Sequence, residues 1–246
     1  MRRFLATGRL VTAVVLGATL AFHALYLLPL SRHLAEWLMR EDLVVEDITF
    51  LSLLAASILG AALTYRARRN GEARLTWILL GLLATGLFFV AMEEISWGQW
   101  VFFFKTPGTW KHLNRQGETN LHNLPGLWGH SEYLRLIFAA GGLAAVWAGM
   151  FPGLRKLATP RALLGTFVVI TSYVVLDMVD DLFAAPWFFK SFSALSEWDE
   201  MLIGLAALAY MVIKWNEWLH PDADVPVLAS TDLVSPVAEQ FSPEAR

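Results

Sequence analysis

Four groups of acidic residues in this chain lie at the ends of long apolar runs. The clearest is Glu93-Glu94 in the stretch AMEEISWGQW, which closes an apolar run that begins at Leu75. An ionised carboxylate at membrane depth is costly, so such residues usually face a protein interior or a wet cavity and mark function. The other groups are Glu46-Asp47, Asp177 with Asp180 and Asp181, and Glu197 with Asp199 and Glu200.

The spacing within two of these groups places carboxylates on one face of a helix. Asp181 follows Asp177 by four residues, and Glu200 follows Glu197 by three. Residues at these separations are neighbours on a helix surface. Carboxylates this close repel one another unless protons, basic side chains or a cation intervene. The spacing therefore predicts either a proton-binding cluster or a cation site.

An imidazole could complete such a site. Three of the six histidines fall in the polar stretch 105–132, and one of them, His122, follows Glu118 by four residues in GETNLHN. If that piece is helical, the two side chains share a face. Several carboxylates with an imidazole suit Zn²⁺, Fe or Mn²⁺, so the sequence predicts a divalent metal as cofactor.

A metal held there could activate water for hydrolysis, with a spare carboxylate as the general base. The predicted metal ligands are Glu93, Glu94, Glu118, His122 and Asp177. The predicted catalytic carboxylates are Glu94, Asp181, Glu197 and Glu200. In the alternative interpretation, the acids pair with loop cations and only fix the fold; these cations are Lys105, Lys111, Arg115 and Lys190.

Membrane-spanning helices must position these residues. The chain is 56% hydrophobic, with a mean hydropathy of +0.49, above the 45–50% apolar content typical of soluble domains. Runs of about 20 apolar residues are long enough to cross a bilayer. We expect an all-α, polytopic transmembrane helical bundle over residues 1–219, followed by a disordered cytoplasmic tail at 220–246. About six spans are expected, near residues 10–30, 46–65, 75–97, 133–150, 162–183 and 198–215.

Composition also excludes several kinds of function. The net charge of −3 gives no indication of nucleic-acid binding. The absence of cysteine excludes disulfides, thiolate metal sites and cysteine nucleophiles. The glycines are scattered, with no glycine-rich phosphate-binding loop. The expected partner is membrane lipid.

Loop charge predicts the orientation. With the N-terminus on the cytoplasmic side, the inner segments hold eleven Lys and Arg residues before the tail and the outer segments hold seven. This bias favours cytoplasmic placement of both termini. All four acidic groups and the histidine-rich loop then lie on the extracytoplasmic side. They share one side of the membrane in either orientation, because that depends only on the number of spans.

Two motifs, EEISWGQ at 93–99 and NRQGETNLHN at 114–123, carry a family resemblance. Together they resemble a family of bacterial integral membrane proteins whose activity is uncharacterised. The resemblance covers roughly residues 40–215 and implies a multi-span protein of the bacterial inner membrane. It implies no activity. By motif position it points to a substrate-binding set of Trp97, Gln99, Asn114, Gln116, Asn120 and Asn123.

These observations favour a metal-dependent hydrolase or transferase acting on a lipid or lipid-linked substrate at the outer leaflet. One alternative is an ion- or proton-coupled transporter. It is less favoured because no acid lies deep in the inner half of any expected span, whereas a pathway needs polar groups across the full depth. The other alternative is a structural or assembly subunit of a membrane complex.

Overall fold

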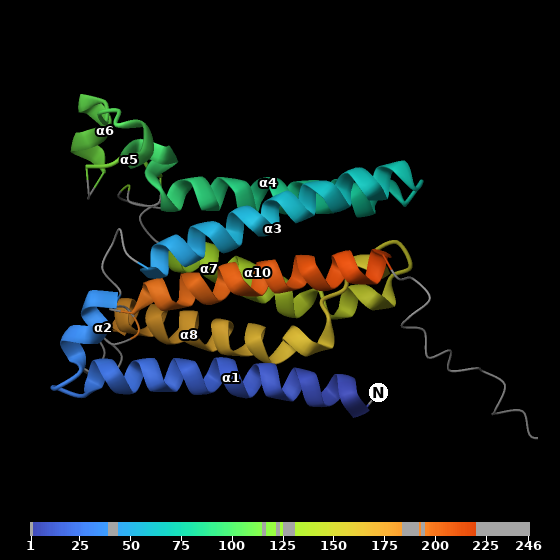
Figure 1. Cartoon of the computed structure of the whole chain (residues 1–246), viewed down its shortest axis with the longest axis horizontal. Helices are drawn as coiled ribbons and strands as arrows, with labels where there is room; N and C mark the ends of the chain where they lie inside the picture. The colour runs from blue at the N-terminus through green and yellow to red at the C-terminus, as the bar shows by residue number, and fades with distance from the viewer. Residues whose placement is uncertain are drawn as a thin grey trace, which may run out of the picture.

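The computed structural model describes residues 2–38, 44–114, 117–121, 124, 131–183, 192 and 195–219. Within these ranges the chain is all-helical, with no strand, as expected. The long helices lie side by side along a common direction (Figure 1). They are α1 (Arg2–Leu27), α3 (Val44–Arg69), α4 (Arg74–Glu94), α7 (Ser131–Ala144), α8 (Leu164–Phe183) and α10 (Ser196–Leu219).

Shorter helices connect them. The short α-helices are α2 (Arg32–Leu38), α5 (Gln99–Phe102) and α6 (Gly108–Leu113). The 3-10 turns are η1 (Ser96–Gly98), η3 (Trp147–Met150), η4 (Arg155–Leu157) and η5 (Arg161–Leu163). In Figure 1, α5 and α6 stand beyond the end of α4, outside the bundle.

Five segments are long and apolar enough to cross a membrane: Arg9–Leu27, Val44–Arg69, Arg74–Glu94, Glu132–Met150 and Arg161–Val179. The expected sixth span corresponds to α10, which is not among these five. It carries two acidic residues in its first turn and a buried lysine, Lys214, farther along. Five segments of the chain therefore have the length and composition of membrane-spanning helices. The sixth span stays a prediction.

The third expected span differs from the observed helix at its end. It was expected to reach Trp97, but α4 ends at Glu94 because Ser96 and Trp97 adopt positive φ angles of 46° and 57°. The fourth expected span, 133–150, agrees with the apolar segment Glu132–Met150, which is α-helical to Ala144 and ends in the 3-10 helix η3. Asn70 and Gly71 form a turn after α3, with Gly71 at φ 72°. It makes α3 and α4 an antiparallel hairpin.

Small residues allow the central helices to approach closely. α3 packs most extensively on α4 and next on α10. A Cβ added at Gly60 of α3 would lie 2.9 Å from Ala84 Cβ and 3.0 Å from Met211 Cε. Small side chains at helix crossings are typical of membrane bundles, where close backbone approach strengthens van der Waals packing. The three-helix contact around Gly60 holds the central layer together.

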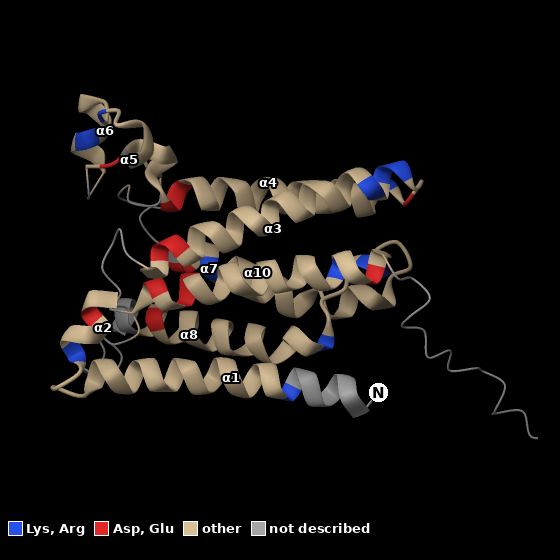
Figure 2. Ribbon diagram, viewed as in Figure 1, with Lys and Arg blue, Asp and Glu red and all other residues tan. Residues whose placement is uncertain are grey.

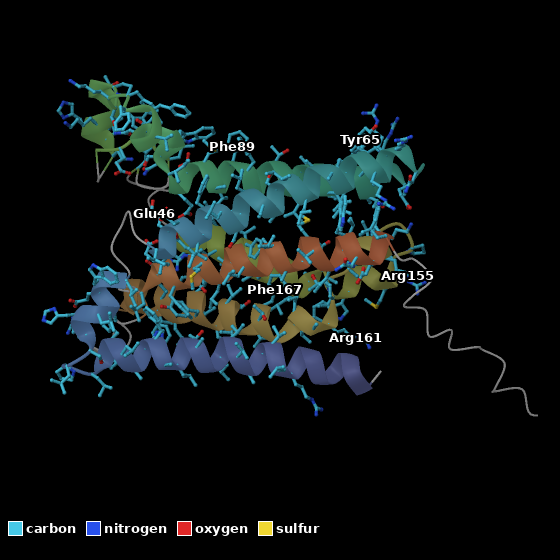
Figure 3. The ribbon with its side chains drawn as sticks, in the orientation of Figure 1. Glu46, Tyr65, Phe89, Arg155, Arg161 and Phe167 are labelled. Carbon is cyan, nitrogen blue, oxygen red and sulfur yellow. The ribbon has the colours of Figure 1, made fainter. Side chains whose placement is uncertain are left out.

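Acidic residues of the long helices gather mainly at one end of the bundle (Figure 2). They lie where α3 and α10 begin and where α4 and α8 end. At the other end lie the arginines that close α3 and those of η4 and η5. Figure 3 shows Glu46 at the acidic end and Arg155 and Arg161 at the opposite end. The predicted gathering of acids at one end of the bundle is thus present for the described residues.

Replacing Gly60 with Leu should lower the stability of the bundle by about 1–3 kcal/mol, the usual cost of overpacking. The added side chain would meet Ala84 and Met211, which belong to different helices. Gly17→Leu is the matched control, because a Cβ there has no neighbour within 4 Å. Thermal unfolding of the detergent-solubilised protein, followed by tryptophan fluorescence, measures both. Equal melting temperatures for the two variants would contradict this account of the packing.

Candidate functional site

Three glutamates from two helices meet at the acidic end. Glu94 is the last residue of α4, whereas Glu197 and Glu200 lie in the first turns of α10. One carboxylate oxygen from each lies within 4.8 Å of the others, and all three side chains are half-buried. We call these three residues the glutamate triad. The three-residue spacing of Glu197 and Glu200 places both on one face of α10, and Glu94 reaches them from the end of α4.

A buried arginine lies next to the triad. Arg135, in the second turn of α7, donates from Nη2 to Asp177 Oδ2 of α8 at 2.6 Å. Its Nη1 lies 3.6 Å from Asp199 Oδ2, and its Nε lies 3.7 Å from Glu200 Oε1. The side chains of Arg135 and Asp177 are 6% and 4% exposed, and that of Asp199 is fully buried. One guanidinium therefore ties α7 to both α8 and α10.

We call Arg135, Asp177 and Asp199 the arginine cluster. Several of its buried polar atoms make no hydrogen bond. Among the described residues, neither carboxylate oxygen of Asp199 has a hydrogen-bond partner, and neither do Nε and Nη1 of Arg135. Their separations of 3.6 and 3.7 Å are too long for hydrogen bonds. Buried polar atoms nearly always find partners, and exceptions are concentrated at functional sites. At these two contacts the buried charges are therefore balanced by ion pairing and not by close hydrogen bonds.

A cavity of about 360 Å³ opens from this cluster. Its polar lining includes Glu93, Glu94, Arg135 and Glu200. The remaining walls are mainly aliphatic and aromatic side chains from α3, α4, α7 and α10, with Leu121 at its edge. An apolar pocket with a few convergent polar groups is the usual form of a small-molecule site.

The two sequence motifs bind each other. Ser96 Oγ donates to Glu118 Oε2 at 2.5 Å, and Asn120 Nδ2 donates to Ser96 Oγ at 3.0 Å and to Glu118 Oε2 at 3.1 Å. Asn114 Nδ2 in turn donates to Asn120 Oδ1 at 2.6 Å. Ser96, Asn114 and Asn120 are all buried. The second motif thus folds onto the end of α4 through side chains of the first.

This network holds a turn of unfavourable backbone geometry. Ser96 and Trp97 have positive φ, and Gly98 follows at 77°. Non-glycine residues in this region cost free energy and persist only where surrounding contacts impose them. Trp97 Nε1 donates to Glu93 Oε1 at 2.5 Å, and Thr119 N donates to Gln99 Oε1 at 3.0 Å. Glu93 also accepts the backbone N–H of Leu121.

The predicted site residues therefore fall into two neighbouring groups. The glutamate triad contains three of the four predicted catalytic carboxylates, and Asp177 lies in the adjoining arginine cluster. Glu118 lies instead in the motif network, and Glu93 connects that network to the cavity rim. Trp97, Gln99, Asn114 and Asn120, predicted to bind substrate, hydrogen-bond within the network. His122, Gln116, Asn123 and the side chain of Asp181 lie outside the described residues.

Sequence reasoning did not select two residues that the structure places at the centre. Arg135 was counted only among the seven Lys and Arg residues of the outer segments, although it lies just inside an apolar run. A cation at the depth of several acids is itself a signal, because intramembrane charges pair with one another. Asp199 was grouped with its neighbours but given no role, because its burial cannot be deduced from spacing alone.

Arg135→Leu should destabilise the fold by about 3–5 kcal/mol, because it leaves Asp177 and Asp199 buried without their cation. Adding Asp177→Asn in the same chain should recover part of the loss. Arg32→Leu, which removes an exposed pair with Glu36, is the control and should leave the melting temperature nearly unchanged. Thermal unfolding compares the four proteins. A melting temperature for Arg135→Leu equal to the wild-type value would show that the cluster is not structural.

Asn120→Ala should release the segment between α4 and α7, because Asn120 links Ser96, Asn114 and Glu118. We expect backbone amides of 96–99 and 117–121 to exchange with deuterium at least tenfold faster, while those of α3 stay unchanged. Lys105→Ala, an exposed change in the same segment, is the control. Unaltered exchange in the Asn120 variant would mean that the network does not hold the segment.

Comparison of the chain with protein-family models, with curated proteins and with solved structures finds no match. The resemblance of the two motifs to a bacterial membrane family consequently stays an expectation. What the motifs do in this chain is visible in their hydrogen bonds.

Proposed function

We propose that this protein is a metal-dependent membrane hydrolase or transferase that acts on a lipid or lipid-linked substrate. The observation that carries the proposal is the convergence of Glu94, Glu197 and Glu200 within 4.8 Å at the polar end of an apolar cavity. Ligand-forming side chains and an apolar binding space are thereby placed side by side. A lipid that is to be cleaved needs both.

The ligand set favours a hard divalent cation. Carboxylate oxygens suit Mg²⁺, Ca²⁺ and Mn²⁺, whereas Zn²⁺ usually takes nitrogen or sulfur ligands. Cation–oxygen distances of about 2.0–2.6 Å place oxygens on opposite sides of an ion about 4–5 Å apart. The 4.8 Å limit on the triad's oxygen atoms is compatible with that span. Among the predicted metals Mn²⁺ therefore fits best, and a cation would offset the mutual repulsion of the three carboxylates.

The orientation that accompanies this proposal has six spans, with α10 as the sixth. The cationic ends of α3, η4 and η5 then face the cytoplasm and the glutamate triad lies at the extracytoplasmic face. The protein then lies in the inner membrane of a bacterium, with both termini on the cytoplasmic side. Burial of Lys214 and its 2.8 Å contact with Glu217 support α10 as a span, because they pair its charges at the cytoplasmic end.

The residues have complementary roles in such a reaction. A divalent cation held by the triad would activate water for hydrolysis of an ester or phosphoester. A triad carboxylate would act as general base toward that water and would return the proton to the leaving alcohol. Arg135, which lines the same cavity, faces the negative charge that develops on the substrate oxygen. Asp177 and Asp199 hold the guanidinium in place.

The purified wild-type protein should bind Mn²⁺, and Glu94→Gln should weaken that binding at least tenfold. Removal of one charged ligand lowers both the attraction for the cation and the number of oxygens available. Asp47→Asn, an exposed acid at the start of α3, is the matched control and should bind like wild type. Titration followed by the electron paramagnetic resonance signal of free Mn²⁺ measures all three. Wild-type protein that binds neither Mn²⁺, Mg²⁺ nor Ca²⁺ would overturn the proposed function.

A further inference from the structure

α4 and α7 leave an apolar groove between them. α4 packs on α3, and α7 packs on α8 and α10, but α4 and α7 make little contact with each other. A second cavity, of about 500 Å³, fills part of this gap. Its walls come mainly from the segment 79–90 of α4 and from 134–145, which is α7 and the residue after it, with α10 behind them.

This cavity continues the one at the glutamate triad. Four residues line both: Leu87, Val90, Leu134 and Phe138. At 1.5 Å per residue, the groove runs about 22 Å along α4 from Glu94 to Leu79. The hydrocarbon core of a bilayer is about 30 Å thick, so the groove extends over most of that depth.

The groove is polar at one end only. Beyond the triad, its lining is almost entirely aliphatic and aromatic. Two polar side chains line the far end, and both are already bonded to backbone carbonyls at 2.8 Å: Thr159 to Gly142 O, and Tyr210 to Leu157 O. An occupant must therefore carry its polar group at the triad and be hydrocarbon along the rest of its length.

We propose that this groove binds the hydrocarbon chain of the lipid substrate, with the lipid's polar head at the glutamate triad. A transmembrane helix of a partner does not fit, because a helix about 10 Å across occupies more than about 1,500 Å³ over the groove's length. The two continuous cavities, of about 500 and 360 Å³, are smaller than that even when taken together. A single extended chain matches both this small volume and the one-ended polarity. The inference rests on the proposed function and names its substrate class as a long-chain lipid.

Two glycines allow the groove to be blocked without disturbing the helices. Gly86 on α4 and Gly141 on α7 both line the 500 Å³ cavity, and a Cβ added at either meets no atom within 4 Å. Gly142 is unsuitable, because a Cβ there would lie 2.2 Å from the ring of Phe167. Gly17 on α1 has equally open surroundings and lines neither cavity. Phenylalanine at these positions gives two blocked proteins and one matched control.

The test uses phosphatidylglycerol with a diazirine at the end of one acyl chain, incorporated into nanodiscs with the full-length protein. After illumination, labelled peptides are quantified by mass spectrometry. We expect labelling of 79–90 and 137–145 to exceed labelling of α1 severalfold in the wild type. Gly86→Phe and Gly141→Phe should each lower that ratio at least fivefold, and Gly17→Phe should not change it. Melting temperatures verify that each variant is folded. If only one of the two blocked variants folds, its labelling ratio is sufficient to test the inference.

Equal labelling of α1 and the groove in the wild type, or an unchanged ratio in a folded blocked variant, would overturn the inference. Mn²⁺ titration of the same proteins separates it from the proposed function. Gly86→Phe should bind Mn²⁺ like wild type, whereas Glu94→Gln should bind Mn²⁺ at least tenfold more weakly and keep groove labelling. A wild type that binds Mn²⁺ without labelling its groove refutes the chain site alone. Groove labelling without Mn²⁺ binding refutes the metal site alone.

Discussion

The structure depends on one buried charge cluster. Arg135 contacts Asp177 at 2.6 Å and approaches Asp199 and Glu200, so a single side chain joins α7, α8 and α10 at the acidic end. Burying charges costs several kcal/mol per ion, which close pairing must offset. Such a cluster contributes more to fixing which helices meet than to net stability. By fixing α10 beside α7, it places Glu200 in the cavity and the triad at its polar end.

Composition was sufficient to predict the helical architecture and the end of the bundle at which the acids lie. It did not predict which acidic side chains contact one another, because that depends on how the helices pack. Apolar runs predicted all-helical architecture, and their alternating direction correctly predicted that Glu94, Asp177 and Glu200 lie at one end of the bundle. Spacing also placed Glu197 and Glu200 on one face. The division of the acids into a glutamate triad and an arginine cluster could not be read from spacing, because it depends on how far α7 lies from α4.

The two motifs illustrate a related limit. Their distinctive residues suggested a binding site, yet Ser96, Asn120 and Glu118 hydrogen-bond to one another across the turn that ends α4. Such polar residues have the same appearance in sequence whether they contact a ligand or a neighbouring loop. Here their contacts support a backbone turn with consecutive positive φ angles. Through Glu93 and Leu121, the network also shapes the rim of the cavity.

The proposed function joins these parts: a charged cluster that positions carboxylates, a loop that frames them and an apolar groove beside them. The most direct measurement is anomalous diffraction from crystals of the protein soaked in Mn²⁺. The account predicts a single strong peak within about 2.6 Å of carboxylate oxygens of Glu94, Glu197 and Glu200. A triad without a peak, with its carboxylates bonded to basic side chains or to one another instead, would contradict it.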